Sequence, residues 1–476
     1  MVTTKQDSTF DPKHITPGFS LLPFTNQVGG HTPFFRLSKR AICKPAERKE
    51  QEFYVYLESH HPELLPFLSQ YLGLLNATYH QDKQAMLPEV IFDNNEQLLK
   101  DWHALSSQQS DRGTPSTTPD ILNDDFQQWS PNADECNLRF TEFRKRALYE
   151  VLNPTALRER IKLQNTCLKQ NAQLQQNDTN IEKLTIQLKV PLNDNMLDGP
   201  LFNETVGMIG DPDDTITSNL NVGRNDNSTS HAFNHDETSS ARWQLRRTPS
   251  NPWGQQMYEK DRLKLQQLTE ACIVKQFIIL EDLTDNIQYP CVLDLKMGNR
   301  HYGVFSSAVK KRSQIAKCVN STSYKLGVRI CGMQVYKSQE QKFVFHDKYM
   351  GHSLDEEGFK QNLADYLDGL LDHIPVLLKK LDRLARIIKS LKGFRFYASS
   401  LLLIYDGGAP KSSRNCRIDV RMIDFAKCVS PDDDSSQFTY PLGNPTGPDE
   451  GYLLGISSLI HKFTEIYKEH QIKNAL

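Results

Sequence analysis

The segment from Pro290 to Gly298 constrains the fold of this chain more than any other. Its sequence, Pro-Cys-Val-Leu-Asp-Leu-Lys-Met-Gly, follows an apolar run from Phe277 to Leu280 and a short polar break. Successive side chains of a strand point to opposite faces, so Asp294 and Lys296 would share one face and leucine and methionine the other. Gly298 would allow the backbone to turn or to approach a ligand closely. An acid and a base are thus predicted on one surface of a β-strand.

A basic segment follows this strand. From Leu295 to Gln339 the chain contains nine Lys and Arg residues and no Asp or Glu, although its totals of 56 basic and 58 acidic residues are nearly balanced. Residues 306–319 predict a helix on which Lys310 and Lys317 lie two turns apart on one face. Solvated helix faces normally mix both signs of charge. The local imbalance therefore favours a polyanion as the ligand.

These features resemble those of a known family. The pattern Pro-x-x-x-Asp-x-Lys-x-Gly is the signature of the inositol polyphosphate kinases, and residues 293–303 are most similar to the inositol hexakisphosphate kinase branch. Further similar blocks follow in order at residues 251–253, 326–336, 399–402 and 423–425. The sequence around 304–309 departs from the pattern of that branch.

The resemblance implies an α+β, bilobal kinase-like fold, related to the ATP-grasp and protein-kinase folds, with a long disordered insertion. The middle of the chain is rich in polar and acidic residues and cannot bury enough apolar surface to order itself. Such an insertion could be a tether or a regulatory, protein-binding segment. The expected parts are a mobile tail (1–24), the first part of the N-lobe (25–105), the insertion (106–245), the end of the N-lobe with the hinge (246–288) and the C-lobe (289–476).

Periodicity predicts several further elements. Residues 47–59 read as a helix, 64–75 as a turn and a strand ending near Gly73, and 394–405 and 416–425 as strands. The apolar spacing over 354–391 is helical, and Pro375 should divide or kink it. Residues 137–185 could form a transient helix, and 452–467 should form the last helix. Asp424 would continue the apolar inward row of its strand, where a carboxylate must be paired or bind a metal.

Site roles follow from the resemblance. Lys44 would reach the nucleotide phosphates and be held by Glu50, with Glu52 the alternative because sequence alone cannot choose between them. The backbone of Glu281 and Leu283 would meet adenine at the hinge, and Asp294 would hold the ribose hydroxyls or help order the site. Lys296, Asp294 and Asp424 are the expected catalytic residues, and Asp424 and Ser399 would bind Mg²⁺. The expected acceptor-binding residues are Lys296, Arg300, Lys310, Lys311 and Lys317.

The implied activity is an ATP-dependent inositol hexakisphosphate kinase that transfers the γ-phosphoryl group to a phosphate of inositol hexakisphosphate. The sequence lacks the His-Arg-Asp loop with which protein kinases accept a hydroxyl proton. A phosphate acceptor needs no such base, because its second pKa is about 6. Two alternatives stay open: a kinase of lower inositol polyphosphates that phosphorylates hydroxyls, and a non-catalytic inositol-phosphate receptor or scaffold.

Composition bounds the remaining expectations. No apolar run is long enough for a membrane span and the N-terminal region lacks the features of a signal peptide, so we expect an intracellular protein of the cytoplasm or nucleus. The nine cysteines include no Cys-x-x-Cys pair and are expected to be reduced core residues. Aromatic residues are too few in the basic segment for nucleic-acid binding. We expect a monomer, with any protein partners at the insertion.

Overall fold

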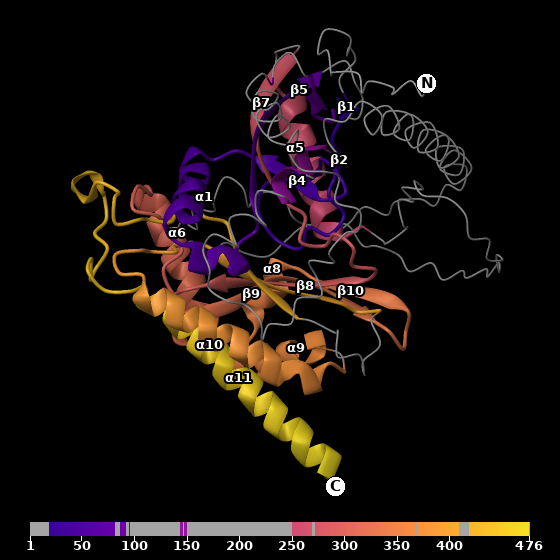
Figure 1. The fold of residues 1–476 in the computed structure, drawn as a ribbon, viewed down its shortest axis with the longest axis vertical. Helices are drawn as coiled ribbons and strands as arrows, with labels where there is room; N and C mark the ends of the chain where they lie inside the picture. Colours follow the sequence, from indigo (N-terminus) through magenta and orange to yellow (C-terminus); the bar gives the residue numbers. More distant parts are fainter. Residues whose placement is uncertain are drawn as a thin grey trace, which may run out of the picture.

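Two antiparallel sheets, one in each lobe, organise the molecule. The computed structural model describes residues 19–80, 86–91, 95, 143–145, 147–149, 250–268, 272–367, 369–408 and 418–475. Figure 1 shows the sheet of the N-lobe above that of the C-lobe, with the two longest helices of the C-lobe below. This arrangement confirms the predicted α+β, bilobal architecture. Apart from residues 143–145 and 147–149, the predicted insertion and the transient helix lie outside the described residues.

The N-lobe sheet has seven strands in the order β1-β6-β5-β7-β4-β3-β2. Its long strand β7 pairs with both β4 and β5, so the part of the chain between β6 and β7 interrupts the lobe before its last strand, as predicted. The strands are β1 Phe19–Ser20, β2 Leu22–Pro23, β3 Phe35–Arg36, β4 Ala41–Pro45, β5 Tyr71–His80, β6 Glu89–Val90 and β7 Cys272–Glu281. Helices α1 Arg48–His60 and α5 Pro252–Gln266 and the 3₁₀ helix Pro62–Phe67 accompany them.

Two boundaries of the N-lobe were predicted wrongly. The tail was expected to reach residue 24, but β1 and β2 pair with β6 and β3 and therefore belong to the sheet. Strand β5 was expected to end near Gly73, yet it continues to His80. The register shifts between Tyr71 and Gly73, and Gly73 has a φ of 139°, so this glycine accommodates an irregularity within the strand.

The C-lobe sheet has the order β10-β9-β8-β11-β12, with the signature strand β8 in the centre. Its strands are β8 Pro290–Met297, β9 Val328–Lys337, β10 Lys342–His346, β11 Ser400–Asp406 and β12 Asp419–Ile423. The helices are α6 Ala308–Val319, α7 Ser323–Leu326, α8 Lys348–Ser353, α9 Glu356–Leu367, α10 Ile374–Ser390 and α11 Glu450–Ala475, with 3₁₀ turns at Leu371–His373 and Ser435–Gln437.

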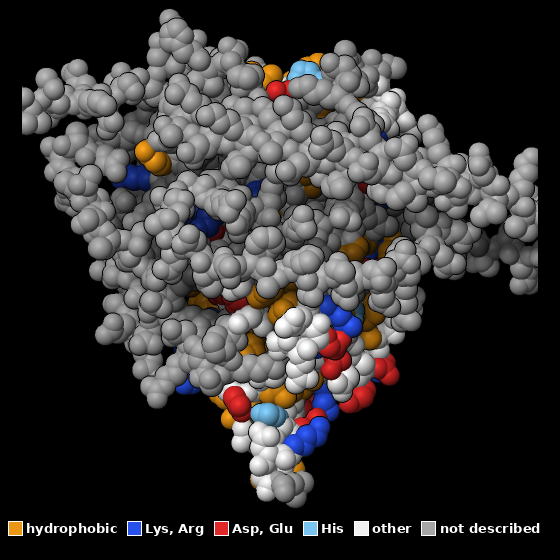
Figure 2. Space-filling model, turned by 90° about the vertical axis from the view of Figure 1, so that its right-hand side faces the viewer, with side chains coloured by type: hydrophobic (Ala, Val, Ile, Leu, Met, Phe, Trp, Pro, Cys, Tyr) orange, Lys and Arg blue, Asp and Glu red, His pale blue; other side chains and the backbone are white. Residues whose placement is uncertain are grey.

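Several C-lobe elements differ in length from their predictions. Pro375 divides the helical stretch because it lies in the first turn of α10, where its missing N–H removes no helical hydrogen bond. The two expected strands form only over β11 and β12. Helix α11 is longer than predicted, and its C-terminal end projects from the body with charged side chains of both signs on its surface (Figures 1 and 2).

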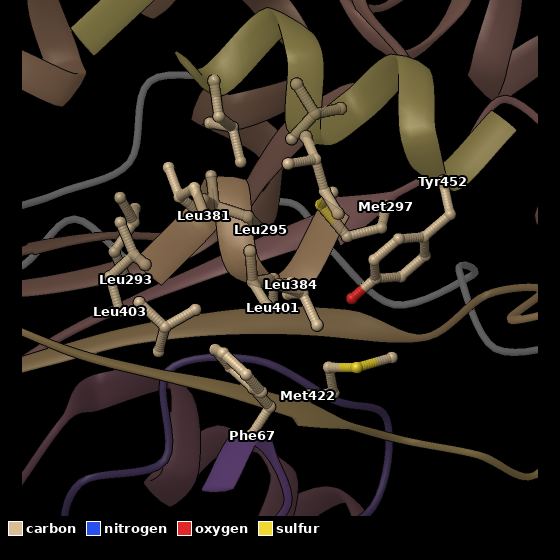
Figure 3. Packing of buried hydrophobic residues seen from close by; sticks show 14 of the residues in the cluster. Phe67, Leu293, Leu295, Met297, Leu381, Leu384, Leu401, Leu403, Met422 and Tyr452 are labelled. Carbon is tan, nitrogen blue, oxygen red and sulfur yellow. The ribbon is translucent and has the colours of Figure 1, made fainter. Parts of the chain in front are cut away.

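The core of the C-lobe fixes the orientation of the signature strand. Leu293, Leu295 and Met297 are fully buried and point toward α10 and α11, where Leu381, Leu384 and Tyr452 also lie (Figure 3). Each such side chain contributes about 1.5–3 kcal/mol when fully buried. Asp294 and Lys296 consequently face the other way, as the alternation predicted.

Two further predictions concern membrane-spanning helices and the state of the cysteines. In the described part of the chain, no helix is both long and apolar enough to cross a membrane. The described cysteines are free thiols: Cys43, Cys291, Cys318 and Cys428 are buried, Cys331 is half-buried and Cys272 is exposed. Cys272 thus departs from the prediction that cysteines are core residues.

The lobes meet closely where β9 passes the segment that joins β2 to β3. A Cβ atom on Gly332 would lie 1.8 Å from the carbonyl oxygen of Val28, which is a backbone atom and cannot rotate away. The hydrogen-bonded register of β9 with β8 holds Gly332 opposite Asp294. Glycine at this position therefore permits the contact between the lobes.

We expect Gly332→Ala to lower the free energy of unfolding by about 1–3 kcal/mol, because the new methyl group displaces the backbone of Val28. Chemical denaturation measures this change. The control is Gly358→Ala in α9, where the nearest atom to the new Cβ is a side-chain oxygen of Asp355 at 3.1 Å. Equal stability of the two variants would contradict the close contact.

Candidate active site

A buried lysine joins the two lobes. Lys44 Nζ, on β4, lies 2.8 Å from Glu50 Oε1 on α1 and 2.6 Å from Asp424 Oδ1, which follows β12. Glu50 also accepts the backbone N–H of Phe425 at 3.1 Å. Glu52 instead pairs with Arg48 on the exposed side of α1. The structure thus resolves the choice between the two glutamates in favour of Glu50.

Asp424 was predicted to continue the apolar inward row of β12, and this prediction is wrong. The strand ends at Ile423, and a φ of 65° at Asp424 turns its carboxylate toward Lys44. Its side chain is 26% exposed, so it is paired but still accessible to a ligand. The other part of the prediction, that this carboxylate needs a partner, agrees with the contact to Lys44.

Charges in this cluster shift one another's pKa values. Burial alone would raise the pKa of Asp424, but the ammonium groups of Lys44 and Lys296 outweigh it and lower that pKa to about 2. Burial would likewise lower the pKa of Lys44, yet Asp424 and Glu50 raise it. The pKa of Glu50 is raised, mainly because this carboxyl group is buried. Lys44 and Asp424 are therefore charged at neutral pH.

The polar face of β8 lies beside this cluster. Asp294 is 3% exposed, and burial raises its pKa to about 6 although the charge of Lys296 opposes the shift. Its Oδ1 atom is buried and makes no hydrogen bond among the described residues. Lys296 Nζ lies 3.5 Å from Ser400 Oγ on β11. An unsatisfied buried oxygen in a polar site indicates a missing hydrogen-bond donor, such as a ligand hydroxyl group.

A glycine pair covers Asp294. A Cβ atom on Gly29 would lie 2.1 Å from Asp294 Oδ2, so only glycine fits without movement. Gln27 donates hydrogen bonds to the carbonyl groups of Gly29 and Thr32, and Trp253 Nε1 donates to that of Gly30 at 3.2 Å. The Asn-Pro-Trp block at the start of α5 therefore braces a loop directly over the acid of the signature strand.

Basic side chains from four segments gather near Lys296. His31 is exposed, and desolvation of its ring together with the charges of Lys348, Lys296, Lys310 and Lys427 lowers its pKa to about 4. Burial and the charges of Lys296 and Lys310 likewise lower the pKa of Lys427. We call His31, Lys296, Lys310, Lys348 and Lys427 the basic cluster. Its mutual repulsion would be relieved by a polyanion.

Three members of the basic cluster were missed by the sequence analysis. His31 follows the glycine pair directly and Lys427 lies three residues after Asp424, so proximity to motif residues was an available signal for both. For Lys348 the chain offered no such signal, because α8 is brought to the site only by the fold.

Two predicted acceptor-binding residues have other contacts. The Arg300 guanidinium lies 4.2 Å from the ring centre of Tyr397 and 4.5 Å from that of Tyr302, and it donates to the Pro441 carbonyl oxygen. Lys311 Nζ lies 4.1 Å from the ring centre of Tyr440. Both side chains thus fasten the 438–443 segment to the C-lobe. Lys317 lies in the last turn of α6, on the same side as Lys310.

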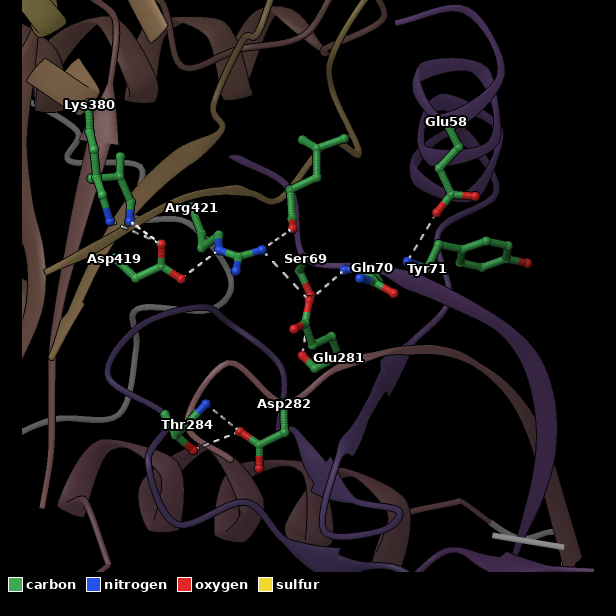
Figure 4. Close-up of polar contacts among 12 residues, drawn as sticks. Glu58, Ser69, Gln70, Tyr71, Glu281, Asp282, Thr284, Lys380, Asp419 and Arg421 are labelled. Carbon is green, nitrogen blue, oxygen red and sulfur yellow. Dashed lines mark hydrogen bonds and ion pairs between the residues drawn. The ribbon is translucent and has the colours of Figure 1, made fainter. Parts of the chain in front are cut away.

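The expected hinge residues Glu281 and Leu283 follow the end of β7. The Glu281 carboxylate accepts the Gln70 N–H at 3.2 Å, and its carbonyl oxygen accepts Ser69 Oγ at 3.2 Å (Figure 4). A carbonyl oxygen has two lone pairs and can accept a second donor. Leu283 packs in a small apolar cluster with Val292 of β8. The side chains of Glu281 and Leu283 already contact other parts of the protein. A planar base bound at the hinge would therefore contact the backbone of these residues.

Arg421 ties the hinge to the strand that ends at Asp424. In β12, its Nε donates to Asp419 at 2.7 Å and its Nη1 donates to the Leu68 carbonyl oxygen at 2.7 Å (Figure 4). The same Nη1 lies 3.8 Å from Glu281 Oε2. One guanidinium therefore connects the entry to β5, the hinge and β12.

Asp424 is the carboxylate best placed for a divalent metal. Among the described residues there is no group of three or more His, Cys, Asp and Glu side chains that could hold a metal ion. A Mg²⁺ site needs only one or two carboxylates when phosphates supply other ligands, so the donor set fits. The Ser399 hydroxyl is fully buried and donates to the Phe396 carbonyl oxygen, whereas Ser400 faces Lys296. Ser400 is thus the serine that faces the site.

Glu50→Gln should lower the free energy of unfolding by about 2–4 kcal/mol, because it leaves buried Lys44 with one carboxylate in place of two. Glu52→Gln, two residues away, should change it by less than about 0.5 kcal/mol, since its ion pair is exposed. Urea denaturation of both variants provides the comparison. Similar losses would show that Glu50 does not neutralise Lys44.

Asp294→Asn should stabilise the protein by about 1–3 kcal/mol at pH 7.5, since it removes a buried charge. The folded-state pKa of Asp294 is raised from 3.8 to about 6, so the wild type gains stability as the pH falls from 7 toward 4, and the variant lacks that gain. Denaturation at pH 7.5 and 5 tests both statements. Asp382→Asn on the surface is the control, and destabilisation by Asp294→Asn at pH 7.5 would refute the assignment.

Comparisons with known proteins agree with this geometry. The inositol polyphosphate kinase family model matches residues 277–464. An uncharacterized inositol polyphosphate kinase of Schizosaccharomyces pombe is 28% identical, covering 94% of this chain and 64% of its own. Inositol hexakisphosphate kinase 3 of Mus musculus is 38% identical, covering 46% of this chain and 57% of its own.

The chain spans less than two thirds of the length of those two relatives. A third, inositol hexakisphosphate kinase 3 of Homo sapiens, is 28% identical over 96% of this chain and 97% of its own. The matched region contains β8 with Asp294 and Lys296, α6, and the segment that ends in Asp424. Residues 277–464 therefore match an inositol polyphosphate kinase domain, and the chain is similar over most of its length to inositol hexakisphosphate kinases.

Proposed function

We propose that the protein transfers the γ-phosphoryl group of ATP to a phosphate group of inositol hexakisphosphate and so forms a diphosphate. The observation that carries this proposal is the basic cluster directly beside the Lys44, Glu50 and Asp424 contact. Two of the relatives bear the name of inositol hexakisphosphate kinases. Intracellular residence, in cytoplasm or nucleus, and a monomeric state belong to the same proposal.

The nucleotide would lie between the lobes. The backbone at Glu281 and Leu283 would bind adenine, and Asp294 Oδ1, which accepts no hydrogen bond from the described residues, would accept a ribose hydroxyl. Lys44 would turn from Asp424 toward the phosphates, while Glu50 keeps it oriented. Asp424 would hold Mg²⁺, which neutralises charge on the phosphates when bound.

The acceptor would lie against the basic cluster. Phosphoryl transfer depends mainly on positioning and charge stabilisation, and Lys296 lies near both Asp424 and the other basic side chains. An acceptor phosphate is largely ionised at pH 7 and needs no base.

The two alternative functions, a kinase of lower inositol polyphosphates and a receptor or scaffold, would each require different groups in the site. A kinase of lower inositol polyphosphates would need a base near the acceptor hydroxyl. A receptor or scaffold would need the basic cluster but not the contact of Lys44 with Glu50 and Asp424, which has no role in binding an inositol phosphate alone. That contact favours an enzyme.

Phosphorus NMR of the products tests the activity. Incubation with Mg²⁺, ATP and inositol hexakisphosphate should give new β-phosphate signals of a diphosphate, and Asp424→Asn should give none while remaining folded. Phosphorylation of a lower inositol polyphosphate without any diphosphate would support the first alternative. No turnover with either acceptor would support the receptor.

Lys310→Glu should raise the KM for inositol hexakisphosphate at least about tenfold and leave the KM for ATP within about twofold, because the side chain belongs to the acceptor half. Lys325→Glu is the matched control, since Lys325 is 73% exposed and pairs with Glu356. Steady-state kinetics separates the two constants. A parallel rise of both constants in Lys310→Glu would show that the change disturbs the fold.

A further inference from the structure

Helix α6 turns an apolar face to solvent. At 100° per residue, Ala308, Val309, Arg312, Ile315, Ala316 and Val319 fall within an arc of about 120°, and all six are exposed. Val309, Ile315 and Val319 are 45%, 41% and 53% exposed. Five of the six residues on this arc are apolar, which is unusual for the outer face of a surface helix.

The opposite side of α6 faces the protein and is mostly polar. Lys310 and Lys317 lie there, and the charge of Lys310 acts on His31 and Lys427. Cys318 is buried and its Sγ lies 3.1 Å from the Asn299 carbonyl oxygen. The helix is therefore amphipathic with the usual orientation reversed: lysines inward and aliphatic side chains outward.

Exposed aromatic residues lie close to both ends of α6 in the sequence. Phe305, just before the helix, is 55% exposed, and Tyr324 on the adjacent α7 is 61% exposed. α6 is adjacent to α7 in the fold. We call Phe305, Val309, Ile315, Val319 and Tyr324 the α6 apolar patch. Val309, Ile315 and Val319 of this patch lie on the outward face of α6.

The chain segment that carries the patch is basic. The segment from Leu295 to Gln339, which includes every patch residue, contains no acidic residue. Arg312 is exposed within the arc itself, and Lys325, 73% exposed beside Tyr324, pairs with Glu356 at 3.5 Å. Aliphatic and aromatic side chains with a basic rim match the interface of an anionic membrane, where apolar groups enter the acyl boundary and cations meet lipid headgroups.

We propose that the α6 apolar patch docks this protein peripherally on anionic membranes. Phe305, Val309, Ile315 and Val319 would enter the boundary between headgroups and acyl chains, and Arg312 would contact anionic headgroups. The inward lysines would keep their place in the basic cluster. This surface is separate from the proposed phosphoryl transfer and does not depend on it.

Co-sedimentation with vesicles tests this proposal. The full chain should bind vesicles of phosphatidylcholine with about one third phosphatidylserine, bind pure phosphatidylcholine much less, and lose binding as salt increases. The double variant Val309→Gln/Ile315→Gln should reduce the partition constant at least about tenfold. The matched control is Leu263→Gln/Val376→Gln, which changes two aliphatic residues that are 50% and 46% exposed on α5 and α10.

Three outcomes would overturn the proposal. The wild type could fail to bind anionic vesicles, or the control variant could lose as much binding as the α6 variant. In the third outcome, sedimentation equilibrium would show that the wild type is a dimer and that only the α6 variant is a monomer. Neither protein would bind vesicles. The patch would then be a contact between two copies of this chain. Circular dichroism and thermal unfolding of both variants verify that each is folded.

Discussion

The contact of Lys44 with Glu50 and Asp424 is the interaction on which the rest of the site depends. It joins β4, α1 and the end of β12, and so links both lobes through one ammonium group. A buried cation is costly unless it is paired, and each carboxylate here is held by it in turn. Arg421 forms a second link, because it connects the same strand β12 to the hinge. These charges act together with the apolar core that α1 and the 3₁₀ helix Pro62–Phe67 share with the C-lobe.

The signature strand couples the core to this charge pattern. Its leucine and methionine side chains pack on α10 and α11, and this packing places Asp294 and Lys296 on the opposite face, where Lys296 also contacts Ser400. Gly29 and Gly332 then let the N-lobe loop approach β8 and β9 within a distance that a side chain would prevent. Packing and close approach together bury Asp294 and raise its pKa.

Local regularities explain what could be predicted from the sequence. Alternation along β8 was sufficient for the orientation of Asp294 and Lys296, and Pro375 was sufficient to divide α10 from α9. The choice of Glu50 over Glu52 depends on how α1 lies against β12, which periodicity does not determine. Arg300 and Lys311 were expected at the acceptor from the resemblance and the local charge, and the rings of Tyr397 and Tyr440, far away in the sequence, lie against them in the fold. His31, Lys348 and Lys427 meet only in the folded protein.

The two faces of α6 have a common origin. A site for a polyanion needs several lysines at one place, and a helix packed beside Lys296 supplies them only if its basic side faces inward. Those inward positions cannot then contain the aliphatic residues that normally anchor a surface helix. The aliphatic residues remain on the outer side, exposed to water at a cost in free energy. An anionic membrane would remove that cost and would also be attracted by the same local excess of positive charge.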